Sequence, residues 1–343
     1  MGSVVTLSTG ELAVAGIGIV APGISGPGDA LAPAGEANPE WFHAEVALPG
    51  RGYRRLPTAG KYLLAAARLA IGDAGNQLSE TGRDRRAAVV ATNNAGAALL
   101  DELDYTIIQK GAEEMPPSST PFMVMSLFAS RLSVEHDITG FNLTVNSPVT
   151  AGLEAIQIAS RAVAAGRAST VLVAAVEEAL SPSQSPGPGS QAGAAVLYCE
   201  PPATGTARYG TCRARSAFLD PALAAGNVAA AVFAPLVGDN PPDRIDAVLD
   251  DSAVGAAAAR WLDQLTGECE VFIVPAIAEA GCLAPLQRVV GLFAQEHTTL
   301  ARRAVLAASA QGTLALAELT VAPRQAATTP AANSMEDTDA RSP

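Results

Sequence analysis

Cations, histidines and cysteines are scarce in this sequence, and the scarcity excludes several classes of function. Its 343 residues hold 22 Lys and Arg against 34 Asp and Glu, which gives a net charge of −12. A phosphate backbone binds clustered cations, so we expect no nucleic acid partner. The four cysteines, Cys199, Cys212, Cys269 and Cys282, lie far apart and form no Cys-x-x-Cys pair. They predict buried, reduced thiols, with no metal site, no disulfide framework and no cofactor.

Long hydrophobic runs are also missing. Hydrophobic residues make up 49% of the chain, but they are mostly Ala, Val and Leu in short runs broken by charge, Gly or Pro. None of these runs reaches the roughly 18 residues that a membrane-spanning helix needs. The first residues, MGSVVTLSTGE, have neither the basic region nor the apolar stretch of a secretory signal. We therefore expect a cytoplasmic protein with a substantial core and no membrane contact.

Short apolar runs alternate with helical patterns along the chain. Runs typical of buried strands lie at residues 11–22, 85–94, 169–180, 194–201, 244–251 and 268–277. Helical patterns lie at residues 56–75, 101–110, 151–166, 252–265 and 282–295, and a hairpin pattern follows at 304–321. In the second part of the chain, strand and helix patterns alternate as in the first part, over fewer residues. The alternation predicts an α/β fold of two similar halves.

The segment NLTVNSPVTAGLEAI, residues 142–156, places a strand directly before a helix. The strand pattern breaks at Ser147 and Pro148, and the helical pattern starts at once. Many enzymes mount a nucleophile on such a turn, because the free amides and the dipole at a helix start stabilise a thiolate or an oxyanion. Here the turn offers Val149, Thr150 and Ala151. It therefore carries no evident nucleophile.

Three stretches, in their order and spacing, resemble a β-ketoacyl synthase of the thiolase-like superfamily. They are AVAGIGIVAPG (13–23), the segment from STPFMVMSLF to VEEAL (119–180) and GAAVLYCEP (193–201). The resemblance implies a thiolase-like α/β fold whose two related halves form α-β-α-β-α layers. The chain would then divide into a flexible N-terminus (1–10), a ketosynthase-like N-terminal half (11–200), a shortened C-terminal half (201–322) and a disordered tail (323–343).

The nucleophile of that family is absent from the matching position. Active members carry Thr-Ala-Cys-x-x-Gly at the turn, and the cysteine takes the acyl chain as a thioester. Matching Gly152 and Leu153 to this motif places Val149 on the cysteine. Valine has no lone pair to donate and no proton to lose, so it can form no thioester.

The family's two histidines and its gate are missing as well. A His-Gly-Thr motif should fall near residues 249–256 and a Lys-x-x-x-Gly-His motif near residues 273–281, but neither segment holds a histidine. The glycine-rich gating loop is reduced to ASAQGT at residues 308–313. The three histidines of the chain lie elsewhere, and we expect them at exposed loops or helix ends: His43, His136 and His297.

The joint loss resembles a chain length factor, the inactive partner of an active ketosynthase in type II polyketide systems. That family usually substitutes glutamine for the cysteine, and Val149 departs from this pattern. The short second half resembles the compact partners of aryl-polyene and highly reducing polyene systems. The resemblance implies an active ketosynthase as heterodimer partner, an acyl carrier protein reached through the complex, and a polyketide acyl chain as ligand.

The resemblance also assigns roles to two segments. In chain length factors, the residues that close the far end of the acyl tunnel match Ala98, Asp101 and Tyr105. Their spacing of three and four places them on one helix face, for which an ordinary amphipathic interface helix is the alternative. The strand before the turn lies against its counterpart across the dimer interface, which assigns to that interface Thr144, Val145, Asn146 and Ser147.

Two other functions stay open at this point. One is a thiolase-fold acyltransferase whose nucleophile has moved to Cys282, where a helix start would lower the pKa of the thiol. The other is an acyl-binding module without a partner. Glu177 and Glu178 could form a carboxylate pair, but for their place after a strand we expect a solvated or helix-capping role.

Overall fold

A mixed sheet of ten strands forms the centre of the molecule, in the order β3-β2-β4-β5-β1-β6-β10-β9-β7-β8. The computed structural model describes residues 10–32, 40–54, 56–117, 124–179, 191–202, 207–226, 228–238, 240–265, 267–276 and 281–324. The strands are β1 Leu12–Val20, β2 Arg86–Thr92, β3 Asn142–Asn146, β4 Thr170–Glu177, β5 Gly193–Glu200, β6 Gly210–Phe218, β7 Arg244–Leu249, β8 Glu270–Pro275, β9 Ala301–Ala308 and β10 Thr313–Val321. The flexible N-terminus and the disordered tail that we predicted lie outside the described residues, except for Gly10 and residues 323 and 324.

The sheet consists of two halves with the same strand order and the same directions. In the first half β3, β2 and β4 are parallel, and β5 runs antiparallel to both β4 and β1. In the second half β8, β7 and β9 are parallel, and β10 runs antiparallel to both β9 and β6. The halves join where residues 12–14 of β1 pair with residues 210–212 of β6. The predicted α/β fold with two related halves is confirmed.

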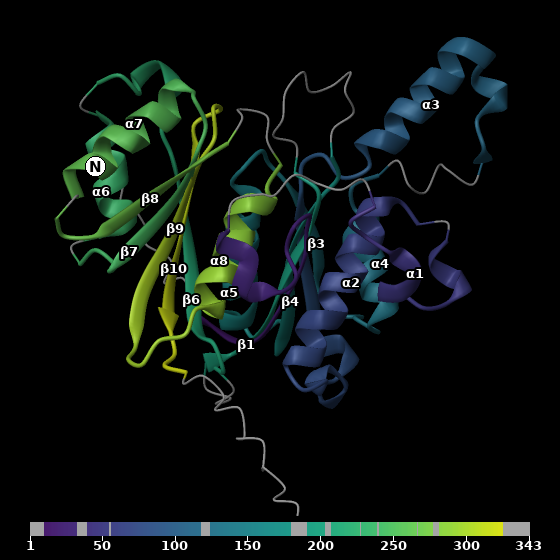
Figure 1. The fold of residues 1–343 in the computed structure, drawn as a ribbon, viewed down its shortest axis with the longest axis horizontal. Helices are drawn as coiled ribbons and strands as arrows, with labels where there is room; N and C mark the ends of the chain where they lie inside the picture. The colour runs from purple at the N-terminus through teal and green to yellow at the C-terminus, as the bar shows by residue number, and fades with distance from the viewer. Residues whose placement is uncertain are drawn as a thin grey trace, which may run out of the picture.

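Helices complete a five-layered structure. Helices α5 (Ala151–Ala164) and α8 (Leu283–Ala294) contact each other and strands of both halves. Helices α2 (Thr58–Asp73) and α4 (Leu127–Glu135) pack on the outer face of the first half, and α6 (Val228–Val237) and α7 (Ala253–Leu262) pack on that of the second (Figure 1). The two halves of the sheet each form one layer between helices, and the order helix, half-sheet, helix, half-sheet, helix confirms the predicted α-β-α-β-α layers.

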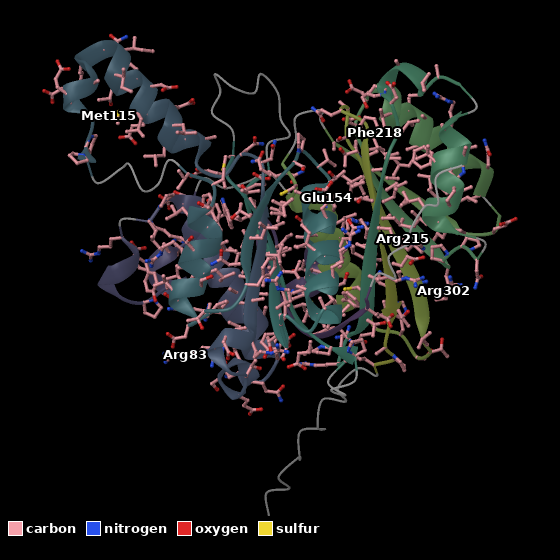
Figure 2. The ribbon with its side chains drawn as sticks, turned by 180° about the vertical axis from the view of Figure 1, so that it is seen from behind. Arg83, Met115, Glu154, Arg215, Phe218 and Arg302 are labelled. Atoms are coloured by element: carbon pink, nitrogen blue, oxygen red, sulfur yellow. The ribbon has the colours of Figure 1, made fainter. Side chains whose placement is uncertain are left out.

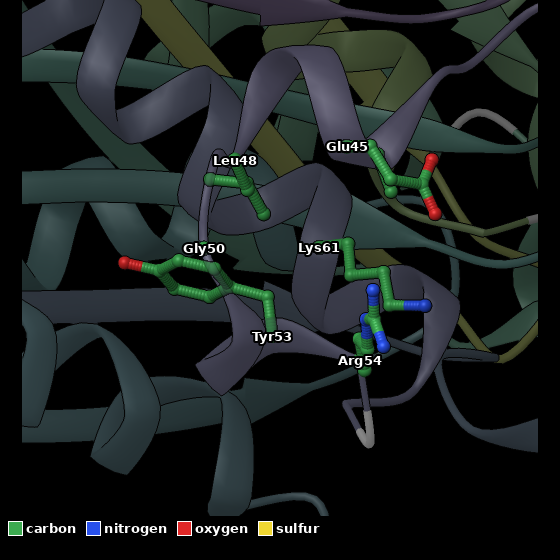
Figure 3. Close-up of a pocket in the computed structure, with 7 residues that line it drawn as sticks. Glu45, Leu48, Gly50, Tyr53, Arg54 and Lys61 are labelled. Carbon is green, nitrogen blue, oxygen red and sulfur yellow. The ribbon is translucent and has the colours of Figure 1, made fainter.

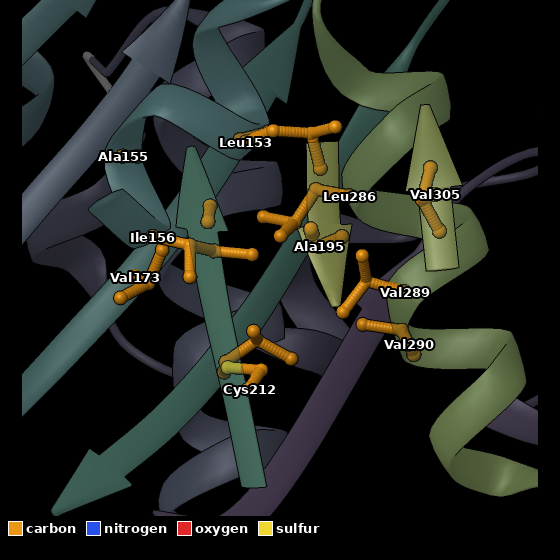
Figure 4. Close-up of a cluster of buried hydrophobic side chains, with 14 of the residues drawn as sticks. Leu153, Ala155, Ile156, Val173, Ala195, Cys212, Leu286, Val289, Val290 and Val305 are labelled. Atoms are coloured by element: carbon orange, nitrogen blue, oxygen red, sulfur yellow. The ribbon is translucent and has the colours of Figure 1, made fainter. Parts of the chain in front are cut away.

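The central core lies between α5 and α8. Leu153 and Ile156 of α5 belong to the same buried cluster as Leu286 and Val289 of α8, and all four side chains are inaccessible to solvent (Figure 4). Burying a Leu, Ile or Val side chain contributes roughly 1.5–3 kcal/mol to folding. This cluster therefore fixes how the starts of α5 and α8 lie against each other.

Some elements differ from the sequence pattern. Strand β6 was not predicted, because Arg213 and Arg215 interrupt its apolar residues; both arginines pair with Glu318 of the neighbouring β10, at 2.5 and 2.7 Å. Helix α6 was not predicted either, and it contains Pro235. Among the described helices, none is long and apolar enough to cross a membrane.

Helix α3 (Ala97–Lys110) extends away from the rest of the molecule (Figures 1 and 2). It begins at Ala97 rather than near residue 101, and only Ala97 and Leu103 of its side chains are buried. Met115 lies near the far end of this projection (Figure 2). The short helix α1 (Ala44–Ala47) carries no buried residue.

Candidate functional site

The turn between β3 and α5 keeps the backbone shape of a nucleophile mount. Val149 has φ of +58°, in the left-handed region, which is a rare conformation for a β-branched residue and costs on the order of 1–3 kcal/mol. The Thr150 amide donates a hydrogen bond to the Pro148 carbonyl at 2.6 Å, and the Thr150 hydroxyl bonds to Glu154 at 3.1 Å. The turn is therefore tightly held, with a hydrocarbon side chain at its centre.

The start of helix α8 meets this turn. Strand β8 ends at Pro275, and α8 begins after Cys282, which is fully buried. A Cβ atom built on Gly152 of α5 would lie only 2.8 Å from the Cys282 carbonyl oxygen and 3.2 Å from the Cβ of Leu286. Glycine at position 152 thus permits the starts of α5 and α8 to approach each other closely.

Glu177, at the end of β4, lies at this meeting point. Its side chain is fully buried. Its Oε1 accepts hydrogen bonds from the backbone N–H groups of Asn93, at 2.8 Å, and of Cys282, at 2.7 Å. Its Oε2 accepts one from the backbone N–H of Asn94 at 2.6 Å. The expectation of a solvated residue is wrong, whereas the bond to Cys282 at the start of α8 fits the helix-capping alternative.

The neighbouring Glu178 is only partly buried and holds a different amide. Its Oε2 accepts a hydrogen bond from the backbone N–H of Gly96 at 3.2 Å, just before α3 begins. Burial raises the pKa of Glu178, and its bonds to Gly96 and to the Thr58 side chain oppose that rise. The two glutamates therefore point to separate amides and do not form the paired carboxylates of an acid and base.

The thiol of Cys282 is not an activated nucleophile. Burial, followed by the carboxylate of Glu177, raises its pKa well above the ordinary value of a cysteine. Burial also raises the pKa of Glu177, and the donors around it oppose that rise. A thiol that holds its proton reacts poorly, so the expectation that a helix start lowers the pKa of Cys282 is wrong.

The three histidines lie away from the β3–α5 turn and from the start of α8. His43 is exposed, as expected, just before α1. His136 lies at the end of α4, which confirms the expected helix-end position, although it is partly buried. His297, between α8 and β9, is partly buried, so for it the expected exposure is wrong. Burial lowers the pKa of both, and the Nε2 atom of each is buried without a hydrogen-bond partner. Within the described residues, no group of His, Cys, Asp and Glu side chains could hold a metal ion.

Comparisons with known proteins agree with this architecture. Residues 41–197 match the family model of the Beta-ketoacyl synthase, N-terminal domain. The solved structure of the ishigamide ketosynthase/chain length factor superposes with a TM-score of 0.69 at 18% identity, over 91% of this chain and 99% of that one. A type II PKS acyl-carrier protein in complex with its ketosynthase bound to the hexaketide gives 0.68 at 14% identity, over 91% and 99%. The fold is that of the ketoacyl synthases.

Curated relatives match over a shorter region. The 3-oxoacyl-[acyl-carrier-protein] synthase 2 of Vibrio cholerae serotype O1 is 25% identical over 141 residues, which are 41% of this chain and 34% of that protein. Its counterpart in Rhizobium meliloti is 26% identical over 146 residues, 42% of this chain and 35% of that protein. The matched region thus spans about a third of the length of these relatives.

Within the ketoacyl-synthase fold, β3 forms one edge of the sheet. It pairs with β2 and with no other strand in the described part of the chain. Thr144 and Val145 are partly buried, and the hydroxyl oxygen of Thr144 is buried without a hydrogen-bond partner. Asn146 is exposed and donates to the Thr92 carbonyl at 3.1 Å, and Ser147 bonds to Glu154 at 3.3 Å. Within the described residues, no other strand covers this edge.

The three residues matched to the tunnel end lie together on α3. Ala98 and Tyr105 are exposed in this chain, Tyr105 at 64%, and Asp101 is partly buried. Ile108, one turn beyond Tyr105, is 76% exposed. The helix therefore presents apolar side chains that this chain does not cover. The assignment of Ala98, Asp101 and Tyr105 to a tunnel stays a prediction.

A small pocket opens on the surface beside α1 and the start of α2 (Figure 3). Its volume is about 220 Å³. Its walls are formed by Ala44, Glu45, Leu48, Gly50, Tyr53, Arg54 and Lys61. None of these residues belongs to the β3–α5 turn or to the start of α8, so this pocket is separate from the site around Glu177.

Proposed function

We propose that this chain is the non-catalytic subunit of a ketosynthase heterodimer, a chain length factor of type II polyketide biosynthesis. One observation carries the proposal. At the tight turn where the fold presents its nucleophile, the side chain is that of Val149, buried and without a reactive atom. Covalent acyl transfer at this position is chemically impossible.

The rest of the site supports the same function. Residues 249–256 and 273–281, where the family resemblance expects histidines, contain none. The thiol of Cys282 is buried and its pKa is raised, which disfavours an acyltransferase with a relocated nucleophile. With valine at the nucleophile position and no histidine in either segment, we assign the condensation chemistry to a partner.

Two surfaces support the need for a partner. Strand β3 leaves an unpaired edge in the described sheet, and α3 carries exposed Tyr105 and Ile108. Exposed edges and apolar patches are typical of interfaces that a second chain covers. In our proposal the second chain is an active ketosynthase, and the pair receives its acyl chain, of the highly reducing or polyene kind, from an acyl carrier protein.

The test is to produce the chain with and without a cognate active ketosynthase. We expect a stable complex, condensation activity in the complex only, and no activity in the isolated chain. A monomeric chain that binds acyl groups tightly and ignores the ketosynthase would instead indicate a partner-free module. Fast stoichiometric alkylation of Cys282 with loss of an activity of its own would indicate an enzyme.

A further inference from the structure

Three backbone N–H groups from distant parts of the chain converge on the Glu177 carboxylate. Asn93 and Asn94 follow strand β2, whereas Cys282 stands at the start of α8. Their nitrogen atoms lie 2.8, 2.6 and 2.7 Å from the carboxylate oxygens, and both oxygens are used. All three donors are fixed by the backbone, so they define a place for an anion with two oxygens.

The space around this carboxylate is shaped to it. A Cβ atom built on Gly281 would lie 2.5 Å from Cγ and 2.6 Å from Cδ of Glu177, so any larger residue at position 281 would displace the side chain. Glu177 is fully buried, and no Lys, Arg or His side chain in the described residues forms an ion pair with it. A buried carboxyl group without a counter-charge is stabilised there by N–H donors that replace water.

We propose that Asn93, Asn94 and Cys282 form a carboxylate-binding site and that Glu177 is its built-in ligand. The site lies where the starts of α5 and α8 meet, so its occupation closes this place to any substrate carboxylate. The inference rests on the fold and on these contacts, and it holds whether or not the chain is a chain length factor.

The substitution Glu177→Ala makes the proposal testable. It deletes Cγ, Cδ and both oxygens, which are the heavy atoms of acetate, and leaves the donors in place. We expect the variant to unfold at a lower temperature than the parent and to regain stability as acetate is added. With acetate at about ten times its dissociation constant, the folding equilibrium constant should rise about 11-fold. Acetamide and chloride at equal concentrations should not produce this rise.

Glu178→Ala is the matched control. Glu178 is the next residue, but it is partly buried and accepts one long backbone bond, from Gly96 at 3.2 Å. Its removal opens a space to solvent rather than a closed cavity with three donors. We expect this variant and the parent to show no specific response to acetate. An acetate response of equal size in all three proteins would overturn the proposal, as would a folded Glu177→Ala protein that does not respond.

Glu177→Gln covers the case in which Glu177→Ala does not fold with or without acetate. The amide fills the same volume, but its NH₂ group faces backbone N–H donors instead of accepting from them. At about pH 8 we expect a lower unfolding temperature than that of the parent, and acetate should not restore it. A glutamine variant as stable as the parent would overturn the proposal. Ketosynthase binding is measured separately, so failure here is distinct from failure of the proposed function.

Discussion

Val149 holds a conformation that its own side chain disfavours. The left-handed φ of +58° is imposed by the buried surroundings of the turn, in which Val149 and Thr150 are both inaccessible to solvent. Strain of this kind persists where the neighbouring structure determines the backbone. The turn has therefore kept the geometry of a nucleophile mount while its side chain supports no chemistry.

The isolated chain should neither acylate itself nor condense acyl-carrier-protein thioesters. Val149 cannot form an acyl-enzyme, and within the described residues no histidine lies at the β3–α5 turn or at the start of α8. Intact-mass spectrometry after incubation with an acyl donor is the measurement, and a stable adduct at any residue would contradict the expectation. Val149→Cys should remain inactive in condensation, because it restores a thiol without the histidines that active members of the family use.

Asp246 on β7 is a buried acidic residue whose pairing with two arginines we expect to stabilise the fold. Its carboxylate accepts hydrogen bonds from Nε of Arg244, at 2.6 Å, and from Nε of Arg288, at 2.7 Å. Arg288 also donates to the Leu31 carbonyl at 2.8 Å, and so connects α8 with the first half. Asp246→Ala leaves Arg288 buried without a counter-charge, and we expect a loss of about 3–5 kcal/mol in the free energy of unfolding, measured by urea denaturation.

The neighbouring pair of Asp243 and Arg303 is the control for that measurement. Asp243 lies 3.2 Å from Arg303, but its side chain is 60% exposed. Solvent screens an exposed pair, so Asp243→Ala should cost no more than about 1 kcal/mol. Equal losses in the two variants would show that burial is not the cause.

Strand β3 and helix α3 are the elements through which this chain would meet a partner. In the described part of the chain, β3 pairs with a single strand, β2, and α3 is attached at its start, where the Gly96 amide is held by Glu178. Their roles can be tested separately.

For β3 the decisive substitution is Val145→Asp. The strand is expected to continue the sheet into the partner and to bury on the order of 2,000 Å² or more. A carboxylate at the partly buried position 145 should abolish co-purification with the ketosynthase. Val145→Thr, which keeps the branched shape, should preserve it. If Val145→Asp is folded and co-purifies normally, the interface lies elsewhere.

For α3 the decisive measurement is the length of the products made by the complex. Ala98 is small and Tyr105 is large, so Ala98→Phe should shorten the products and Tyr105→Ala should lengthen them, with dimerisation intact. Ile107, on the opposite face by helical spacing, is the control, and Ile107→Ala should leave the length unchanged. Unchanged chromatograms for both test variants would remove α3 from this role.

At the scale of the whole molecule, we expect the net charge to cause electrostatic repulsion between copies of the isolated chain. The charge of −12 at neutral pH falls to zero near the isoelectric point of about 4.7. Repulsion then vanishes while the apolar side chains of α3 stay exposed. Light scattering at low salt should show self-association as the pH is lowered toward 4.7, and the complex with a ketosynthase should resist it. A chain that stays monodisperse through this range would contradict the expectation.

The layered order was what the resemblance to the β-ketoacyl synthases implied, whereas most strands and the α/β alternation followed from apolar runs and helical patterns. Strand β6 did not, because the apolar character of its exposed face is broken by Arg213 and Arg215, and their partner Glu318 is more than a hundred residues away in sequence. Helix α3 could be predicted as a helix, but its projection from the body could not. Periodicity indicates which face is apolar and does not indicate what covers that face.

The missing nucleophile was evident without coordinates, since a valine side chain cannot accept an acyl group wherever it lies. The burial and hydrogen bonding of Glu177 and the raised pKa of Cys282 could not be predicted from the sequence. In the sequence, Glu177 follows a strand and Cys282 precedes a helix, which favoured a solvated carboxylate and an activated thiol. Folding brings the amides of Asn93, Asn94 and Cys282 onto one carboxylate and removes water from it. Burial and hydrogen bonding depend on segments far apart in the chain, so they arise only when the chain is folded.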